Sequence, residues 1–248
     1  MRKINLLIEI INYFFRGVYF FTNSRRLLSI KYIFSFIKPI PNGYNSQSGQ
    51  DKIAEDLLIN LNIIKNKLKI VDIGSNHPIV INNTYYFEKN RNAEVFSIEP
   101  NPEFIPLYKK HKRDLISHGV GNVKEKSTLF VPKNNDDRKY GSHVYGTFNL
   151  SKINDSNKEN IITYMVNIFP LSYLIEKGEY DILFIDVEGF EEDVLNGIDF
   201  ELFSFNLIFI ENNCNLRKPY VLRKFLFQKG YKLYGRIHNL DDIFIKKI

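Results

Sequence analysis

The 248-residue sequence lacks several features, and each absence excludes a class of protein or site. With one cysteine, Cys214, it has neither a disulfide framework nor a metal site made only of thiolates. It has no G-x-G-x-x-G motif, which argues against a pyrophosphate cradle for a nicotinamide dinucleotide. The apolar stretch from Ile4 to Phe21 is interrupted by Glu9 and Arg16, so we expect no transmembrane span there. No small-residue cleavage site follows it, so no cleavable signal peptide is expected.

Basic charge is concentrated at the beginning of the sequence. Residues 1–41 contain seven basic residues and one acid, whereas the remaining residues contain 27 basic and 27 acidic side chains. A domain that grips nucleic acid with its folded body needs a basic surface on that body, and no nucleic-acid-binding motif is present. We therefore expect no nucleic-acid partner, and we divide the chain into a basic leader, residues 1–45, and a neutral body, residues 46–248.

The leader has the pattern of amphipathic helices. Its polar residues Asn5, Glu9, Asn12 and Arg16 follow at spacings of four, three and four, which places them on one stripe of a helix. A basic, largely apolar helix is typical of a segment that lies in the plane of an anionic membrane face. A helix pair packed on the body or on a second subunit fits the pattern equally well. We expect a cytoplasmic protein, with contact between residues 1–41 and the inner membrane face as one of these two alternatives.

In the body, short apolar runs alternate with helical patterns. The runs that predict buried strands are Lys69–Ile73, Glu94–Glu99, Asp181–Val187 and Asn206–Glu211. The segments with a helical period are 51–65, 103–111 and 218–229. This alternation predicts an α/β domain with a parallel sheet covered on both faces. The last two strands, expected at 231–237 and 243–248 around a turn at 239–242, are predicted to be antiparallel.

Four predicted strands carry an acidic side chain at or near their carboxyl ends, where open parallel sheets bind ligands. These side chains are Asp72, Glu99, Asp186 and Glu211. Gly74 lets the backbone approach a ligand closely, and Glu99 is placed to accept both hydroxyls of a ribose. Without a pyrophosphate cradle, the pattern favours a nucleoside that lacks a pyrophosphate. Taken alone, it also fits a turn glycine with surface acids.

A denser group of acids, Asp186, Glu188 and Glu191, lies within six residues. Such a group can bind hydroxyls, act as a general base or ligate a hard divalent cation. The alternative is a helix N-terminus with one functional acid. We favour function because Asp186 ends a fully apolar strand. Among the histidines, His77 directly follows the ligand loop and is the best acid–base candidate.

At these positions the sequence resembles the FkbM family of S-adenosylmethionine-dependent methyltransferases. The segments that carry the resemblance are Val71–Pro78, Ile98–Pro102 and Ile185–Glu191, with later landmarks at Ile210–Glu211 and Gly230–Tyr231. Three further segments resemble one subgroup, namely Ser46–Asp51, Asn83–Tyr85 and Lys112–Asp114. The similarity runs from about Ser46 to the C-terminus and does not include the leader. Pro78 stands where such loops often have a second glycine.

The resemblance implies a class I methyltransferase fold, a Rossmann-like seven-stranded sheet with an antiparallel last strand. It implies methyl transfer from S-adenosylmethionine to a hydroxyl oxygen, often on a sugar of a surface polysaccharide or a lipid-linked glycan. By this resemblance the cofactor-binding residues are Asp72, Gly74 and Glu99, together with Ser75, Asn76 and Asn101 from the same segments. Asp186 and Glu188 would face the reacting centre, and we keep His77 as the alternative base.

Two other functions remain open at this point. A nicotinamide-dependent sugar oxidoreductase would share the sheet, although the missing glycine motif argues against it. A non-catalytic interaction protein that retained the fold is the other, because a fold alone does not establish an activity. We expect the methyltransferase, with a divalent cation as an optional second cofactor.

Overall fold

The structure, a computed structural model, describes residues 32–34, 42–63, 65–132, 146–150, 160–212, 218–237 and 241–247. Its strands are β1 (Tyr32–Phe34), β2 (Lys69–Ile73), β3 (Glu94–Ile98), β4 (Gly119–Val120), β5 (Glu125–Pro132), β6 (Ile161–Phe169), β7 (Gly178–Ile185), β8 (Phe203–Glu211), β9 (Tyr231–Ile237) and β10 (Asp241–Lys246). Its helices are α2 (Gln50–Asn60), α3 (Tyr85–Arg91), α4 (Ile105–Lys110), α5 (Glu191–Asn196) and α6 (Lys218–Gln228), with short 3-10 turns η1 (Pro102–Phe104) and η5 (Leu171–Tyr173).

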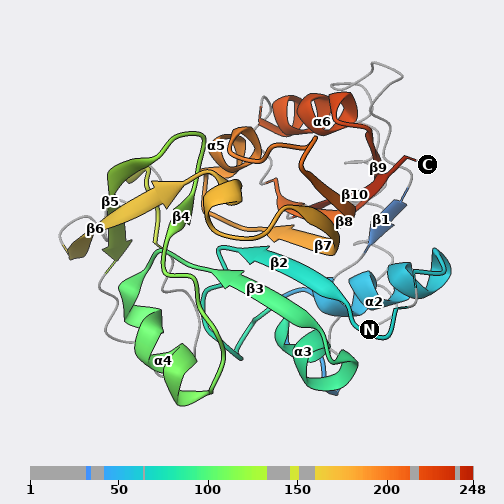
Figure 1. The fold of residues 1–248 in the computed structure, drawn as a ribbon, viewed down its shortest axis with the longest axis horizontal. Helices are drawn as coiled ribbons and strands as arrows, with labels where there is room; N and C mark the ends of the chain where they lie inside the picture. Colours follow the sequence, from blue (N-terminus) through green and yellow to red (C-terminus); the bar gives the residue numbers. More distant parts are fainter. Residues whose placement is uncertain are drawn as a thin grey trace, which may run out of the picture.

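The strands form a large central sheet and a small side sheet (Figure 1). The central sheet has the order β1-β9-β10-β8-β7-β2-β3, and the side sheet has the order β4-β6-β5. In the centre, β3, β2, β7 and β8 are parallel neighbours, as the apolar runs predicted. The α/β class with a parallel sheet is therefore confirmed.

Both faces of the central sheet are buried. Adjacent residues of β7 alternate between two cores, since Ile182 packs in one and Leu183 in the other. Helices α5 and α6 cover the face of Leu183, and α2 and α3 cover the face of Ile182 (Figure 1). A strand segment covered on both sides favours apolar residues at successive positions, which explains the unbroken run Ile182–Ile185 in β7.

The last strand, β10, is antiparallel to both of its neighbours, β8 and β9, as predicted. The predicted turn at 239–242 was wrong for Asp241 and Asp242, which are the first residues of β10. Two buried arginines make this possible, because Arg223 and Arg236 both form ion pairs with the Asp242 carboxylate. A carboxylate with such partners tolerates a buried strand position that an unpaired one would not.

The leader contributes a strand where helices were predicted. Residues Tyr32–Phe34 form β1, which pairs in parallel with Gly235–Ile237 of β9. The reason is that β9 would otherwise present an open row of backbone donors and acceptors, which a short run of strand-forming residues satisfies. The sheet thus takes six strands from residues 46–248 and its seventh from the leader. The predicted helices in residues 1–31 and 35–41 lie outside the described residues.

Among the helices that the structure describes, none has the length and apolar character needed to cross a membrane.

Candidate active site

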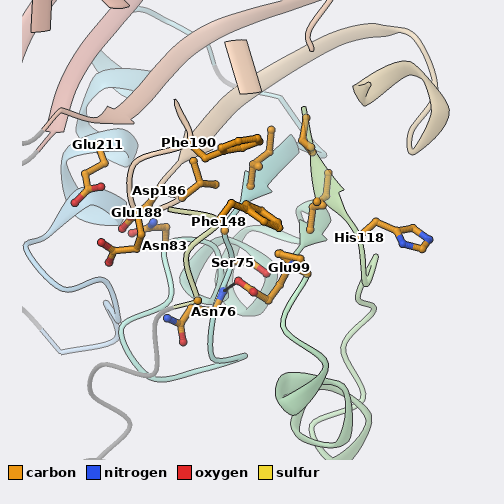
Figure 2. A pocket seen from close by; sticks show the side chains of 18 of the residues that line it. Ser75, Asn76, Asn83, Glu99, His118, Phe148, Asp186, Glu188, Phe190 and Glu211 are labelled. Carbon is orange, nitrogen blue, oxygen red and sulfur yellow. Dashed lines mark hydrogen bonds between the residues drawn. The ribbon is translucent and has the colours of Figure 1, made fainter. Parts of the chain in front are cut away.

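A cavity of about 250 Å³ opens at the carboxyl ends of the parallel strands (Figure 2). Its polar lining residues are Gln47, Gln50, Ser75, Asn76, Asn83, Glu99, His118, Asp186, Glu188 and Glu211. Gly74 and the apolar side chains of Ile98, Val120, Phe148 and Phe190 complete much of the wall. Of the nine predicted site residues, the cavity brings together Gly74, Ser75, Asn76, Glu99, Asp186 and Glu188. Asp72, His77 and Asn101 do not line it.

Gly74, directly after β2, lies against the backbone of Asp186, directly after β7. Its φ of +83° is in the left-handed region, and a Cβ atom there would lie 1.8 Å from the backbone oxygen of Asp186. The Gly74 amide donates to the Ile98 carbonyl at 2.9 Å, which ties the loop after β2 to the end of β3. Only glycine tolerates both the positive φ and the close approach to Asp186. The loop therefore presents backbone without a side chain beside the cavity.

The Glu99 carboxylate is fixed at the other end of the cavity from Glu211 (Figure 2). One carboxylate oxygen accepts from the Asn101 amide at 2.8 Å and the other from the Asn76 amide at 3.1 Å. Burial raises the pKa of Glu99 to about 7, against the opposing effect of these two hydrogen bonds, and the charge of Asp72 adds to the rise. The remaining lone pairs are free to accept hydroxyl groups from a ligand.

Asn101 supports Glu99 through its backbone instead of contacting the cavity. Its side-chain oxygen accepts from the Glu103 amide at 3.0 Å and caps η1. Ser75 is held in place as well, because the Tyr108 hydroxyl donates to its Oγ at 2.8 Å. The structure thus shows Asn101 positioning Glu99, and the predicted contact of Asn101 with the cofactor stays a prediction.

Asp72 also lies outside the cavity lining. It is 1% exposed, and the Thr84 hydroxyl donates to its carboxylate at 3.2 Å. Burial raises the pKa of Asp72 to about 7, against the opposing effects of Arg113 and of the bond from Thr84. In the structure Asp72 contacts the scaffold behind the loop, and its predicted contact with the cofactor stays a prediction.

That scaffold centres on two residues that the sequence did not single out, Asn82 and Arg113. The Asn82 amide group donates to the carbonyls of Ser75 and His77, both at 3.0 Å. Its oxygen accepts from the Thr84 and Tyr85 amides at 3.0 and 2.7 Å. The resemblance at Asn83–Tyr85 and Lys112–Asp114 marked this region without giving it a role.

Arg113 connects the scaffold to α3 and to the loop. Its guanidinium is buried and donates to the Pro78 carbonyl and to the Glu88 carboxylate. It also donates to Asn82 Oδ1 at 3.3 Å and to Thr84 Oγ1 at 3.1 Å. A planar fork with several donors is suited to holding a loop through many acceptors at once.

His77 is a capping residue of the same loop. Its Nδ1 accepts from the amides of Ile79 and Val80 at 3.1 and 2.9 Å. Burial, followed by the nearby His111 and Arg113, lowers the pKa of His77. Nδ1 is therefore engaged within the loop and the ring does not line the cavity, so the role of His77 as the alternative base stays a prediction.

Three carboxylates gather on the side of the cavity opposite Glu99. Asp186, Glu188 and Glu211 each offer an oxygen, and these oxygens lie within 4.8 Å of one another. Burial, followed by the charges of Glu211 and Glu188, raises the pKa of Asp186 well above its usual value. Burial and the charges of Glu188 and Glu191 raise the pKa of Glu211 to about 8. Such a group can share protons, accept one from a hydroxyl or ligate a hard cation.

A strained turn presents this group to the cavity. Glu188 has a φ of +50°, which is uncommon for a residue other than glycine. The turn is held from two sides, because the Thr147 hydroxyl donates to the Glu188 carbonyl at 3.1 Å and the Gly189 amide donates to Glu191 at 2.8 Å. Backbone strain of this kind persists where the surroundings fix it, and it gathers at functional sites.

The sequence matches the model of one protein family, described as the methyltransferase FkbM domain, over residues 72–233, which is more than half of the chain. No curated protein matches the sequence. Among solved structures, the chain is similar to precorrin-6y C5,15-methyltransferase from Geobacter metallireducens GS-15, with 12% identity and a TM-score of 0.41, covering 87% of this chain and 94% of that one. A methyltransferase from Pyrococcus furiosus aligns with 15% identity and a TM-score of 0.38, covering 96% of this chain and 99% of that one.

Proposed function

Because the chain belongs to the FkbM methyltransferase family, we propose that it methylates a hydroxyl oxygen on a sugar of a surface polysaccharide or a lipid-linked glycan. The chain is a methyltransferase, and its family implies the use of S-adenosylmethionine. One observation supports the assignment of residues most strongly. The bare backbone of Gly74, the carboxylate of Glu99 and the Asp186 group all line one cavity.

The residues present fit the cofactor. Gly74 lines the cavity with backbone alone, and Glu99 offers carboxylate oxygens suited to ribose hydroxyls. Ile98, Val120 and Phe148 give the same half of the cavity an apolar wall suited to a purine ring. When bound, the cofactor supplies an electrophilic methyl group.

The chain's own residues have two tasks, to align the acceptor oxygen and to take its proton. A sugar hydroxyl is a poor nucleophile while it is protonated, so a nearby base speeds its reaction. Asp186 and Glu188 are the bases that we propose, with Glu211 completing the group. Because burial and neighbouring charges raise the pKa of Asp186 and of Glu211, the group can accept the hydroxyl proton near neutral pH.

The same three carboxylates are also a set that a hard divalent cation prefers, and we keep a cation as an optional second cofactor. Turnover in the presence of excess EDTA separates the two roles. If the carboxylates act as the base, EDTA leaves turnover unchanged. If they hold a cation, EDTA abolishes turnover and added Mg²⁺ restores it, because a bound cation lowers the pKa of a hydroxyl that contacts it.

The cofactor assignment is tested by Glu99→Gln, which keeps the shape of the side chain and removes its charge. We expect S-adenosylmethionine to bind at least about tenfold more weakly, because charge-assisted hydrogen bonds to hydroxyls are lost. Isothermal titration calorimetry measures this directly. Glu94→Gln, at the other end of β3 and outside the cavity lining, is the matched control and should bind normally. Unchanged binding by Glu99→Gln would remove the ribose assignment, and binding of NAD(H) in a parallel titration would favour an oxidoreductase.

A lipid-linked acceptor would bring the protein to a membrane, and the leader is suited to meet it there. Residues 1–41 hold seven basic side chains and one acid, a balance that favours an anionic surface. We therefore propose a cytoplasmic protein whose leader contacts the inner membrane face.

A further inference from the structure

The proposed function leaves one wall of the cavity without a role, the segment of residues 44–50 that leads into α2 and includes its first residue. Gln47 and Gln50 from this segment line the cavity. Gln50 is only 5% exposed, its Nε2 donates to Asp241 at 2.9 Å, and its Oε1 accepts from the Ser48 amide at 2.8 Å. Both ends of the Gln50 amide are therefore engaged, which fixes this side chain as part of the wall.

The segment lies beside the carboxylate side of the cavity. Asp241, the partner of Gln50, is opposite Glu211 in the register of β10 and β8. Ser46 forms an isolated bridge with Ile81, so the neighbouring Gln47 lies next to the loop that carries Asn83. In the view of Figure 2, Asn83 is drawn on the same side of the cavity as Glu188, and Glu99 on the other side. The amides of Gln47 and Asn83 therefore belong to the part of the cavity that the cofactor assignment does not use.

The Asp51 carboxylate holds the segment rigidly. It accepts from the amides of Asn45 and Ser46 at 2.6 and 3.1 Å, and from the Ser46 hydroxyl at 2.5 Å. A wall that is fixed in advance loses little conformational freedom when a ligand binds. It can therefore discriminate between ligands instead of adapting to each of them.

The charge of the cavity lining indicates what this part can accept. Among the described lining residues there are four carboxylates and no lysine or arginine. Without a bound metal, a phosphate or carboxylate on the acceptor would meet like charges, and the described part of the lining offers no basic side chain to pair with it. Amide groups such as those of Gln47 and Asn83 both donate and accept, which matches the hydroxyl groups of an uncharged sugar.

We propose that Gln47, Asn83 and Glu188 form an acceptor subsite that binds uncharged, hydroxyl-rich sugar units and rejects acidic or phosphorylated ones. The proposal rests on the proposed function, because it concerns the acceptor of the same reaction. Gln47 and Asn83 contact the acceptor and determine its specificity. Gln50 is a positioning residue that fixes the wall on which Gln47 lies.

The experiment measures sugar binding to the full chain by saturation-transfer NMR in the presence of excess S-adenosylhomocysteine. The probes are methyl glycosides of glucose, galactose and mannose, and two charged relatives of the first, methyl glucuronide and glucose 1-phosphate. We expect a signal from at least one neutral glycoside and none from the charged probes. Gln47→Ala and Asn83→Ala should each weaken binding of the neutral probe about three- to tenfold, which is the effect of losing one or two hydrogen bonds.

A charge-introducing variant makes the test sharper. Gln47 is exposed at the cavity mouth, so Gln47→Arg should fold and should gain binding of methyl glucuronide. Asn60→Ala, at the exposed end of α2 and outside the cavity lining, is the control and should bind every probe as the unchanged chain does.

Failure of this inference is distinguishable from failure of the proposed function. Charged probes that bind as well as neutral ones, the absence of a signal from every neutral probe, or unchanged binding in both alanine variants would overturn the subsite. Calorimetry with S-adenosylhomocysteine is done separately on each variant, and the affinity should not change, since these residues lie away from Glu99. If the unchanged chain does not bind S-adenosylhomocysteine, the proposed function itself fails.

Discussion

At the scale of single residues, Gly74 is the position where the backbone tolerates least change. A Cβ atom there would overlap the Asp186 carbonyl, and the positive φ is unfavourable for alanine in any case. Gly74→Ala must therefore push the ends of β2 and β7 apart. We expect it to lower the free energy of unfolding by more than the about 1–3 kcal/mol of backbone strain alone, and to abolish cofactor binding.

Chemical denaturation and cofactor titration measure the two effects. Gly230→Ala is the matched control, because Gly230 also has a positive φ, +88°, but a Cβ there would meet nothing within 4 Å. Gly230→Ala should lose stability from backbone strain alone and should bind the cofactor with unchanged affinity. Equal stability losses in the two variants, with cofactor binding retained in both, would mean that the contact with Asp186 is unimportant.

The sequence located the acids of the site well but could not show which way each of them faces. Glu99, Asp186 and Glu211 were expected at one sheet edge, and the cavity confirms that they share it. Asp72 differs because side chains alternate along a strand. Val71 and Ile73 of β2 pack in one core and Ile70 in the other, so Asp72 shares the face of Ile70, away from the cavity. The apolar pattern of a strand does not tell which face of the sheet borders the cavity. The sequence alone therefore could not show that Asp72 faces away from it.

At the scale of elements, the loop after β2 depends on a neighbouring segment for its shape. Arg113 follows α4 in the chain but donates to acceptors in the loop and on α3. Arg113→Lys keeps the charge and loses the fork, which leaves buried acceptors without donors. We expect a loss of about 1–3 kcal/mol in unfolding free energy and weaker cofactor binding, because the Pro78 carbonyl and Asn82, which holds Ser75, lose a donor.

The matched control is Arg91→Lys, whose ion pair with Glu55 lies at 3.3 Å and whose side chain is 40% exposed. Because lysine keeps the charge beside Glu55 and the Arg91 side chain is partly exposed, neither stability nor affinity should change appreciably. A loss of stability in Arg113→Lys without any change in cofactor affinity would show that the scaffold supports the fold but not the site.

Element types were predicted better than element ends. The helix expected at 51–65 is α2, and it ends at Asn60. Asn62 adopts a left-handed φ of +54°, which stops the helix even though the apolar period continues. Strand β1 was missed for a related reason. Whether this short apolar run becomes a helix or a strand depends on the open edge of β9, and the residues that pair are 203 positions apart in the sequence.

At the scale of the whole molecule, the contact of the leader with a membrane can be tested without disturbing the sheet. Deleting residues 1–31 removes six of the seven basic residues of the leader and keeps β1. We expect the shortened chain to unfold at the same temperature and to stop sedimenting with phosphatidylglycerol vesicles.

Arg25→Gln with Arg26→Gln in the full chain is the milder variant, and it should weaken vesicle binding by about 1 kcal/mol for each charge removed. Neutral vesicles give the reference, since they offer no surface charge. A deletion that unfolds the body, or full binding to neutral vesicles, would instead favour a leader packed on protein.

The place of β10 between β8 and β9 affects how the protein is made. During synthesis, β8 and β9 emerge before the strand that must lie between them. Until β10 inserts, both have an unpaired edge, and such edges pair readily with other chains. Asp241, which meets Gln50, arrives with the same strand, so the cavity wall is also completed late. A nascent chain halted before residue 241 should therefore be inactive and prone to aggregate, and it should depend on chaperones until that final strand is released.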